Sequence, residues 1–275
     1  MNITVVTLFP DWVSSWADVG VTGRAIQKDL AQWSVINPRD FCHDDHGQVD
    51  DRPYGGGPGM VMKFEPMHAA IEQARTQAPV DTQVIALTPQ GEPFNQSLAH
   101  ELTTASGLVL VAGRYEGMDE RIVEHDIDRE ISIGDYVLSG GELGAMVIAD
   151  AVLRLLPGVV GEAESLVDES FEQGRLDYPH YTRPDTVDGA AVPEVLMSGN
   201  HQEIAQWRQC QAVIRTYQRR PDLLDRWPPS DTEQAWIEQW LESSEQKPAK
   251  PEQSTVKSAV KSMPQSFTKT AKTVS

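Results

Sequence analysis

Short, predominantly apolar or β-branched runs recur along the first half of the chain. They cover Ile3–Phe9, Val84–Leu87, Leu108–Ala112 and the Gly-interrupted stretch Ile131–Leu138. A run in which such residues fill consecutive positions, and not only alternate positions, is typical of a strand covered on both faces of its sheet. The pattern therefore predicts buried strands at these four places, with one or two short strands in the last of them.

Between these runs, apolar positions recur at helical spacing. Helices are predicted to open near Val21–Ala25, with Thr22 as the N-cap, and to cover Phe64–Ala74, Gln96–Thr104 and Glu142–Leu156, the last ended by Pro157. Apolar strands that alternate with helices indicate an α/β domain with a mainly parallel sheet.

The pattern changes after Gly161, where the chain becomes polar and irregular. Further on, Asn200 with Glu203, and Ser230 with Glu233, have the spacing of helix capping boxes. We therefore expect a small all-α C-terminal domain. The organisation predicted is a ligand-binding α/β domain at 1–160, a linker at 161–189, a helical domain at 190–246 and a disordered Lys-rich tail at 247–275.

Charge bears on the kind of partner. The net charge is −18, yet the last 29 residues hold six lysines and one acid. An acidic chain disfavours nucleic acid as a partner unless a local basic patch exists. Two distant cysteines, no apolar run of about 18 residues and no basic leader point to a cytoplasmic protein without a membrane segment.

Glycine- and proline-containing loops follow three of the predicted strands, at Thr88–Gly91, Gly113–Gly117 and Ile131–Leu143. Ligands of parallel sheets bind at the carboxyl ends of the strands. Three such loops predict a backbone-lined pocket for a flat polar ligand such as adenosine. Neither the Gly-x-Gly-x-x-Gly dinucleotide motif nor a P-loop motif is present, which argues against those two classes.

Six segments together resemble the signature blocks of bacterial tRNA (guanine-N1-)-methyltransferases, in the family's order. They are Gly20–Ala25, Asp50–Met60, Gly113–Gly117, Ile131–Leu143, Asp177–Pro184 and Ser198–His201. The resemblance implies a SPOUT-like fold with a deep trefoil knot and a homodimer with its active site at the interface. It also implies methyl transfer from S-adenosyl-L-methionine to N1 of the guanosine immediately 3′ of the anticodon in tRNA.

The resemblance further implies which residues hold the cofactor. They are Leu87, Pro89, Gly113, Tyr115, Ile133, Gly134, Asp135, Tyr136, Val137, Leu138, Gly140 and Gly141. For Tyr136 and Leu138, ordinary packing in the core is the alternative that the residues alone leave open.

The resemblance makes Arg154 the residue that stabilises the guanine oxyanion, although an ion pair with Asp150 four residues earlier is an alternative. The chain departs from the family at the general base. Where the family has Asp-Ser-Phe, this sequence has Asp168-Glu169-Ser170-Phe171. Aligned on Ser-Phe, the base falls on Glu169, with Asp168 as the alternative; both acids could also be merely solvated.

The residues expected at the RNA are His46, Asp50, Asn200, His201, Arg208 and Arg215, with Arg219 on the stripe of the two arginines. A solvated helix face is the alternative for that stripe. His43 and His46 have the spacing of metal ligands but no third ligand in register, so no metal site is predicted. Magnesium could assist the reaction, although no ligand set for it is visible.

Two other classes of function remain compatible with the sequence. One is an enzyme of the same knotted class that acts on a different RNA nucleotide. The other is a non-catalytic protein that binds RNA or senses the cofactor on the same fold. The nucleoside formed in treated tRNA would separate the first from the main hypothesis, and the absence of any methyl transfer would favour the second.

Overall fold

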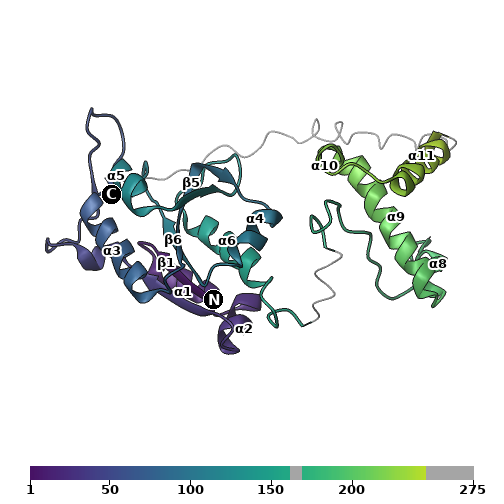
Figure 1. The fold of residues 1–275 in the computed structure, drawn as a ribbon, viewed down its shortest axis with the longest axis horizontal. Helices are drawn as coiled ribbons and strands as arrows, with labels where there is room; N and C mark the ends of the chain where they lie inside the picture. The colour runs from purple at the N-terminus through teal and green to yellow at the C-terminus, as the bar shows by residue number, and fades with distance from the viewer. Residues whose placement is uncertain (162–168, 246–275) are drawn as a thin grey trace, which may run out of the picture.

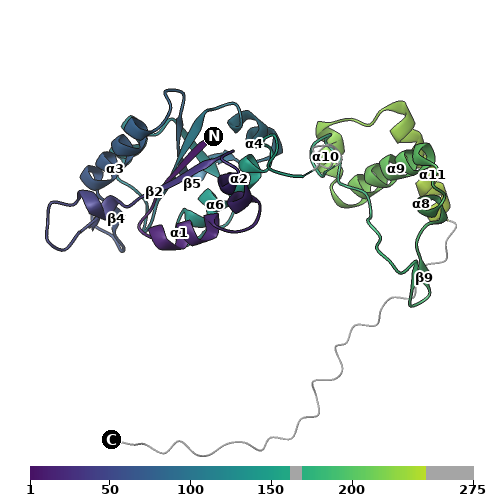
Figure 2. The ribbon, with the colours of Figure 1, turned by 90° about the horizontal axis from the view of Figure 1, so that it is seen from below.

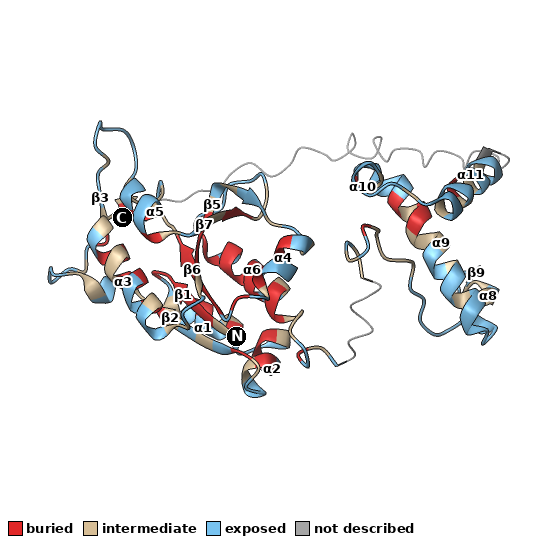
Figure 3. Cartoon of the chain, in the orientation of Figure 1, coloured by how far each residue is buried: buried red, intermediate tan, exposed pale blue. Residues whose placement is uncertain are grey.

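The computed structural model describes residues 1–161 and 169–245. At its centre lies a five-stranded sheet in which every neighbouring pair is parallel, as the apolar runs predicted. Its order is β2 (Gln32–Ile36), β1 (Asn2–Val6), β6 (Gly107–Ala112), β5 (Gln83–Pro93) and β7 (Arg129–Ser132). Figure 1 labels the three central strands, β1, β6 and β5, and Figure 3 labels all five.

Helices cover both faces of this sheet because its strands are apolar on both sides. Alternate residues of β6 divide between two buried clusters: Leu108 and Leu110 join one, Val109 and Val111 the other. The first cluster includes residues of α1 (Pro10–Ala17), α2 (Gly20–Gln27), α4 (Gln96–Leu102) and α6 (Glu142–Leu153); the second includes residues of α3 (Phe64–Gln77) and α5 (Glu120–Asp126). Figure 3 shows the buried positions concentrated where these layers meet.

Two local predictions were wrong, and a third was met at its lower bound. Thr22 does not cap α2; it lies buried inside the helix, which begins two residues earlier. Thr88–Gly91 does not end β5, because the strand resumes after a register shift between Leu87 and Glu92, both of which pair with Ile131. Of the one or two short strands expected within Ile131–Leu138, one is observed: β7 ends at Ser132, and bends follow it at 133–136.

An arm leaves the sheet between β2 and α3. It contains a short 3-10 helix, η1 (Pro38–Phe41), and an antiparallel pair of β3 (Asp50–Asp51) with β4 (Val61–Met62). The glycines joining β3 to β4 have positive φ, and Tyr54 at the start of that turn is fully exposed. Met62 forms a bridge to Met118, which fastens the arm beside the loop that follows β6.

The C-terminal half is helical after a small hairpin of β8 (Thr186–Val187) and β9 (Ala190–Ala191), as Figure 2 shows. The helices are α8 (Glu194–Met197), α9 (His201–Arg219), α10 (Pro221–Arg226) and α11 (Asp231–Glu245). Both predicted starts are observed: Asn200 caps α9, and Ser230 and Glu233 form a reciprocal capping box on α11. The predicted tail, 247–275, lies outside the described residues.

Buried apolar residues join these helices to one another. Val213 and Ile214 of α9 are buried together with Leu223 of α10 and Ile237 of α11. Further along α9, Tyr217 is partly exposed and packs edge-on against Trp240 of α11. None of the helices in the described parts of the chain is long and apolar enough to cross a membrane.

Candidate functional site

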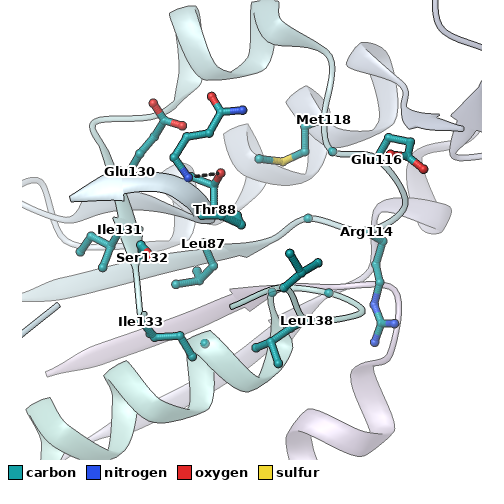
Figure 4. A pocket seen from close by; sticks show the side chains of 18 of the residues that line it. Leu87, Thr88, Arg114, Glu116, Met118, Glu130, Ile131, Ser132, Ile133 and Leu138 are labelled. Carbon is teal, nitrogen blue, oxygen red and sulfur yellow. Dashed lines mark hydrogen bonds between the residues drawn. The ribbon is translucent and has the colours of Figure 1, made fainter. Parts of the chain in front are cut away.

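A cavity of about 440 Å³ opens at one edge of the sheet. Its walls come from the irregular part of β5, from the loop after β6 and from the loop between β7 and α6. Figure 4 shows side chains from these segments, among them Leu87, Met118, Ile133 and Leu138, grouped around it. The loops that the sequence placed at strand ends therefore do meet, although one of them is an interruption within β5.

Two of the loops are fastened directly to each other. Gly141 donates its N–H to the carbonyl of Gly113 at 2.9 Å, and Arg114 forms a bridge with Gly140. The guanidinium of Arg114 also donates to the carbonyl of Ser139 at 3.1 Å. These contacts give the cavity a wall whose shape is set mainly by backbone atoms.

A buried carboxylate holds this wall to the sheet. Glu142 is 1% exposed, and its Oε1 accepts a 2.9 Å hydrogen bond from the hydroxyl of Thr7, at the end of β1. Arg114 Nε lies 3.0 Å from Oε1 and 2.9 Å from Oε2 of Glu142, while its guanidinium covers the ring of Phe9. The pair therefore connects β1, the loop after β6 and the start of α6.

Glycine is required where the loops touch. A Cβ on Gly141 would lie 2.8 Å from the Ala112 Cα, a distance that real side chains do not tolerate. Gly134 has a φ of +146°, which L residues rarely adopt. Close backbone approach is therefore observed at Gly141, whereas Gly134 is required for its backbone conformation.

All the residues expected to hold the cofactor line this cavity except Asp135, which the described lining does not include. Tyr115, Tyr136 and Val137 are more than 45% exposed, so their apolar surfaces are available to a ligand, and core packing does not account for them. Sequence reasoning assigned no cofactor role to several lining residues: Glu116, Met118, Glu120, Glu130, Ser132 and Gly144. Glu116 and Ser132 lay inside recognised segments, whereas Met118, Glu120 and Glu130 carried no distinguishing signal.

Arg154 and Glu169 form an ion pair in which Arg154 Nη2 lies 2.6 Å from Glu169 Oε1. The side chains are 26% and 34% exposed. The hydrogen bond that Arg154 donates to Glu169 raises the pKa of the guanidinium, with burial acting in the opposite direction and Asp150 adding only a nearby charge. Arg154 therefore pairs with the predicted base and not with Asp150. Asp168, the alternative base, lies outside the described residues.

The segment that carries Glu169 rests against α4. Glu172 accepts a 2.7 Å hydrogen bond from Gln96 Nε2 and lies 2.8 Å from His100 Nε2. On its other side the segment reaches the helical half, where Arg175 pairs with Glu233 and the Leu176 N–H donates to Thr216. Glu169 is thus held between the two halves of the chain.

The ion pair and the cavity lie at opposite ends of α6. Gly141 directly precedes the helix and lines the cavity, whereas Arg154 caps its C-terminus. Thirteen residues at ~1.5 Å each separate the two by about 20 Å along the axis. Within one chain, the pair is therefore too far from the cavity to act on a ligand bound there.

The residues expected at the RNA are dispersed over the surface. His46 is exposed in the arm before β3, where Asp50 lies, and neither lines the cavity. Asn200 caps α9 through its side-chain oxygen, beside the exposed His201. Arg208 is exposed and covers the ring of Tyr178 at 4.8 Å, while Arg215 is half-buried.

The His43–His46 segment does not gather into a metal site. Asp44 accepts hydrogen bonds from the N–H groups of Gln48 and His46, and these bonds lower the pKa of its carboxyl group. Across the described residues, no group of three or more His, Cys, Asp or Glu is placed to hold a metal ion.

A parallel sheet covered on both faces, with a cavity built from loops at one edge, defines an α/β protein that binds a small ligand at its strand ends. The chain belongs to the family described as tRNA (Guanine-1)-methyltransferase TrmD, whose model matches residues 1–226.

Relatives named tRNA (guanine-N(1)-)-methyltransferase are similar over most of their length. The protein of Tolumonas auensis is 53% identical over 242 residues, which is 88% of this chain and 97% of the relative. That of Vibrio vulnificus is 49% identical over 247 residues, 90% and 99% of the two chains. That of Methylococcus capsulatus is 56% identical over 224 residues, 82% and 89%.

Proposed function

We propose that this protein transfers a methyl group from S-adenosyl-L-methionine to N1 of the guanosine immediately 3′ of the anticodon in tRNA. Family membership supports the reaction class, and the Arg154–Glu169 pair is the observation that carries the chemistry. Guanine presents N1–H and O6 side by side, so a base and an oxyanion donor for it must also be neighbours.

The chemistry of the cavity fits the proposed methyl donor. Backbone groups of the loops after β6 and β7 can bind the edge of an adenine, and the exposed faces of Tyr115 and Tyr136 can cover its ring. Glu116, Glu120 and Glu130 line the same cavity and favour a ligand that carries a sulfonium and an ammonium. When bound, the donor supplies an activated methyl group.

The residues of this chain then position and deprotonate the acceptor. Glu169 accepts the N1 proton, and Arg154 donates hydrogen bonds to O6 as negative charge develops there. Glu169 is favoured over Asp168 by the alignment on Ser-Phe and by its contact with Arg154. Entry of the guanine replaces the ion pair, so that each partner gains a hydrogen bond to the base.

We propose a homodimer, because about 20 Å of α6 separates the cavity from the ion pair. Leu143 and Val147, on successive turns of α6, are 44% and 47% exposed, and Arg154 lies about two turns further along. An antiparallel copy packed on this apolar stripe would bring the pair of one protomer to the cavity of the other. The proposal includes the deep trefoil knot of the SPOUT class, with loops 113–117 and 133–141 in it.

The segments of the chain then have different roles. The sheet domain binds the methyl donor, and residues 161–189 carry the catalytic acid. The helical residues 190–246 bind the anticodon stem-loop through Asn200, His201, Arg208 and Arg215. His46 and Asp50, in the arm, are proposed to meet the entering guanine. A tRNA substrate places the reaction in the cytoplasm. Magnesium is not part of this proposal, since the described residues offer it no ligand cluster.

Single-turnover transfer to unmodified tRNA, followed by nucleoside analysis, tests the proposal. Glu169→Gln should slow transfer by about 10²- to 10⁴-fold, because it removes the base while keeping the shape. Glu169→Asp should retain much of the rate, and Asp168→Asn should retain nearly all of it. Loss of rate in Asp168→Asn but not in Glu169→Gln would move the base to Asp168, and methyl on another atom would refute the assigned product.

Mixing two inactive variants tests the shared active site. Leu138→Arg blocks the cavity, and Glu169→Gln removes the base, so neither homodimer should transfer methyl. After subunit exchange, half of the dimers carry one intact composite site, which predicts about one quarter of the wild-type activity. No recovery of activity in the mixture would show that each chain works alone.

A further inference from the structure

A second cavity, of about 390 Å³, lies wholly within the helical half. It is formed by the segment from Tyr178 to Asp185, by Val192, and by α8 and the start of α9. None of its residues belongs to the methyl-donor cavity or to the Arg154–Glu169 pair. It is large enough for a nucleotide, and its lining is unusual in this acidic chain.

The lining combines an apolar floor with exposed aromatic and charged groups. Leu196, Met197 and Ile204 form part of the apolar surface. Tyr181 is 48% exposed and packs against Trp207 with 6.4 Å between ring centroids, so one side of its ring is supported. An aromatic ring supported in this way is a platform on which a base can stack.

The charged groups in this cavity are available to a ligand. Arg183 is exposed, and among the described residues no ion pair or hydrogen bond to its guanidinium is found. The carboxylate of Asp185 is likewise exposed and, within the described chain, accepts no hydrogen bond. An arginine suits a phosphate, and a carboxylate suits the amino or imino donors on the edge of a base.

The surrounding charge also favours a polyanion. Although the whole chain carries a net charge of −18, the stretch from Arg175 to Arg220 holds six arginines and five acids. A nucleic acid that avoids the acidic surface elsewhere would therefore find a neutral to slightly basic surface here.

This cavity shares a wall with the one that contains Glu169. Tyr178 and Arg208 line both this cavity and a third one of similar size, which also includes Glu169 and Trp236. The guanidinium carbon of Arg208 lies 4.8 Å from the centre of the Tyr178 ring, and both residues lie at the boundary between the two cavities. An RNA strand that brings a base to Glu169 would thus pass Arg208 and present a nearby nucleotide to Tyr181.

We propose that the cavity lined by Tyr181, Arg183 and Asp185 binds an unpaired nucleotide of the RNA substrate other than the target guanosine. The base stacks on Tyr181 and offers donors to Asp185, while Arg183 holds a phosphate. This inference rests on the proposed tRNA substrate and extends it to a second recognition site, which adds affinity and orients the strand.

Binding of a fluorescent anticodon stem-loop RNA to the full-length protein, without methyl donor, tests the site. Tyr181→Ala should weaken binding roughly 5- to 100-fold, the range for loss of one stacked base, whereas Tyr181→Phe should stay within about twofold of wild type. Arg183→Gln should weaken binding and reduce the slope of log K against log salt by about 0.7 to 0.9. Arg226→Gln on α10 makes the same charge change outside the cavity and should leave the slope unchanged.

Abasic RNAs identify the occupant. At one unpaired position other than the target, removal of the base should weaken binding to wild type but not weaken binding to Tyr181→Ala any further. Wild-type affinity in both Tyr181→Ala and Arg183→Gln would overturn the proposal. The proposal would also be overturned if the effect of Tyr181→Ala depended on the base of the target guanosine alone. The same holds if it depended on the base at no position, which would indicate a structural role for Tyr181 or a pocket for a protein partner.

The wild-type protein separates failure of this inference from failure of the proposed function. If it forms 1-methylguanosine in tRNA while the cavity variants bind normally, only the second site is wrong. If it neither binds nor methylates tRNA, the proposed function is wrong as well. Circular dichroism and the thermal midpoint of each variant show that loss of binding is not loss of fold.

Discussion

The buried pair of Arg114 and Glu142 gives the sharpest prediction about the sheet domain. Glu142→Leu leaves the Thr7 hydroxyl, which is fully buried, without an acceptor, and leaves the 18% exposed Arg114 without its counter-charge. Removing one partner of a buried pair costs about 3–5 kcal/mol of unfolding free energy. Arg114→Leu should cost at least as much, since the carboxylate it leaves behind is only 1% exposed.

The double variant should be less destabilised than the sum of the two single variants. Once both charges are gone, no uncompensated ion remains, so we expect a coupling energy of roughly 2 kcal/mol or more. Urea unfolding followed by tryptophan fluorescence measures all four proteins, with Trp16 and Trp33 reporting from the sheet domain. Asp119 and Arg121 form an ion pair nearer the surface, 26% and 62% exposed, and provide the matched control. A double-mutant cycle on this pair should give a coupling energy of at most about 1 kcal/mol.

The affinity for the cofactor should show the same pattern in these variants, because Arg114 also donates a hydrogen bond to the Ser139 carbonyl of the cavity wall. The single variants should weaken binding of S-adenosyl-L-methionine measured by calorimetry. Stability effects that simply add, with a coupling energy under about 0.5 kcal/mol, would refute the idea that this pair fastens the loops to the sheet.

Three further predictions concern other parts of the chain. Gly141→Ala should destabilise the fold by about 1–3 kcal/mol and weaken cofactor binding in calorimetry, because its Cβ would meet the Ala112 backbone, whereas Gly144→Ala, whose Cβ lies 3.4 Å from the Leu87 side chain, should be tolerated. Arg208→Ala and Arg215→Ala should each weaken tRNA binding and reduce the slope of log K against log salt in anisotropy titrations. Unchanged slopes would show that these arginines are only solvated and do not contact the RNA. Burial raises the pKa of Glu233, but hydrogen bonds from Arg175 and Ser230 outweigh it, so the net shift is downward. A carboxyl group with a lowered pKa stabilises the fold above the ordinary glutamate value of 4.5, and this stabilisation is lost as the pH falls through the pKa of the folded state. Acid should therefore loosen α11, measured by the near-ultraviolet circular dichroism of the wild type, and should have less effect on Glu233→Gln.

The sequence predicted the buried strands well because they are apolar on both faces. It missed β2, an edge strand in which Gln32 and Ser34 are polar, and it missed α1 between Pro10 and Ala17. Pro89 and Gly91 were interpreted as the end of a strand, although β5 recovers its pairing with β7 after the interruption. The local sequence indicates which residues of a strand break its regular structure, but it does not indicate the pairing with a neighbouring strand that allows the strand to continue.

The candidate site was predicted for a different reason. Glycine-containing loops predicted a cavity lined by backbone, and the close contact of Gly141 with the Ala112 backbone shows it. In contrast, fifteen residues separate Arg154 from Glu169, and no periodicity relates them. Only the resemblance to a family connected those two positions. Glu142 was assigned simply to the start of a helix, because nothing in the sequence indicates that its carboxylate would be buried against Thr7.

The length of α6 constrains how this protein can change over evolutionary time. Its first turn is held to the loops of the cavity, and its C-cap residue, Arg154, pairs with Glu169. Inserting or deleting a single residue would turn one end relative to the other by about 100° and shift it by ~1.5 Å. On its exposed side, which is the proposed dimer contact, one apolar residue can replace another, but a change of length would have to occur in whole turns together with a matching change in the segment that carries Glu169. We therefore expect homologues to vary in the composition of this helix far more than in its number of residues.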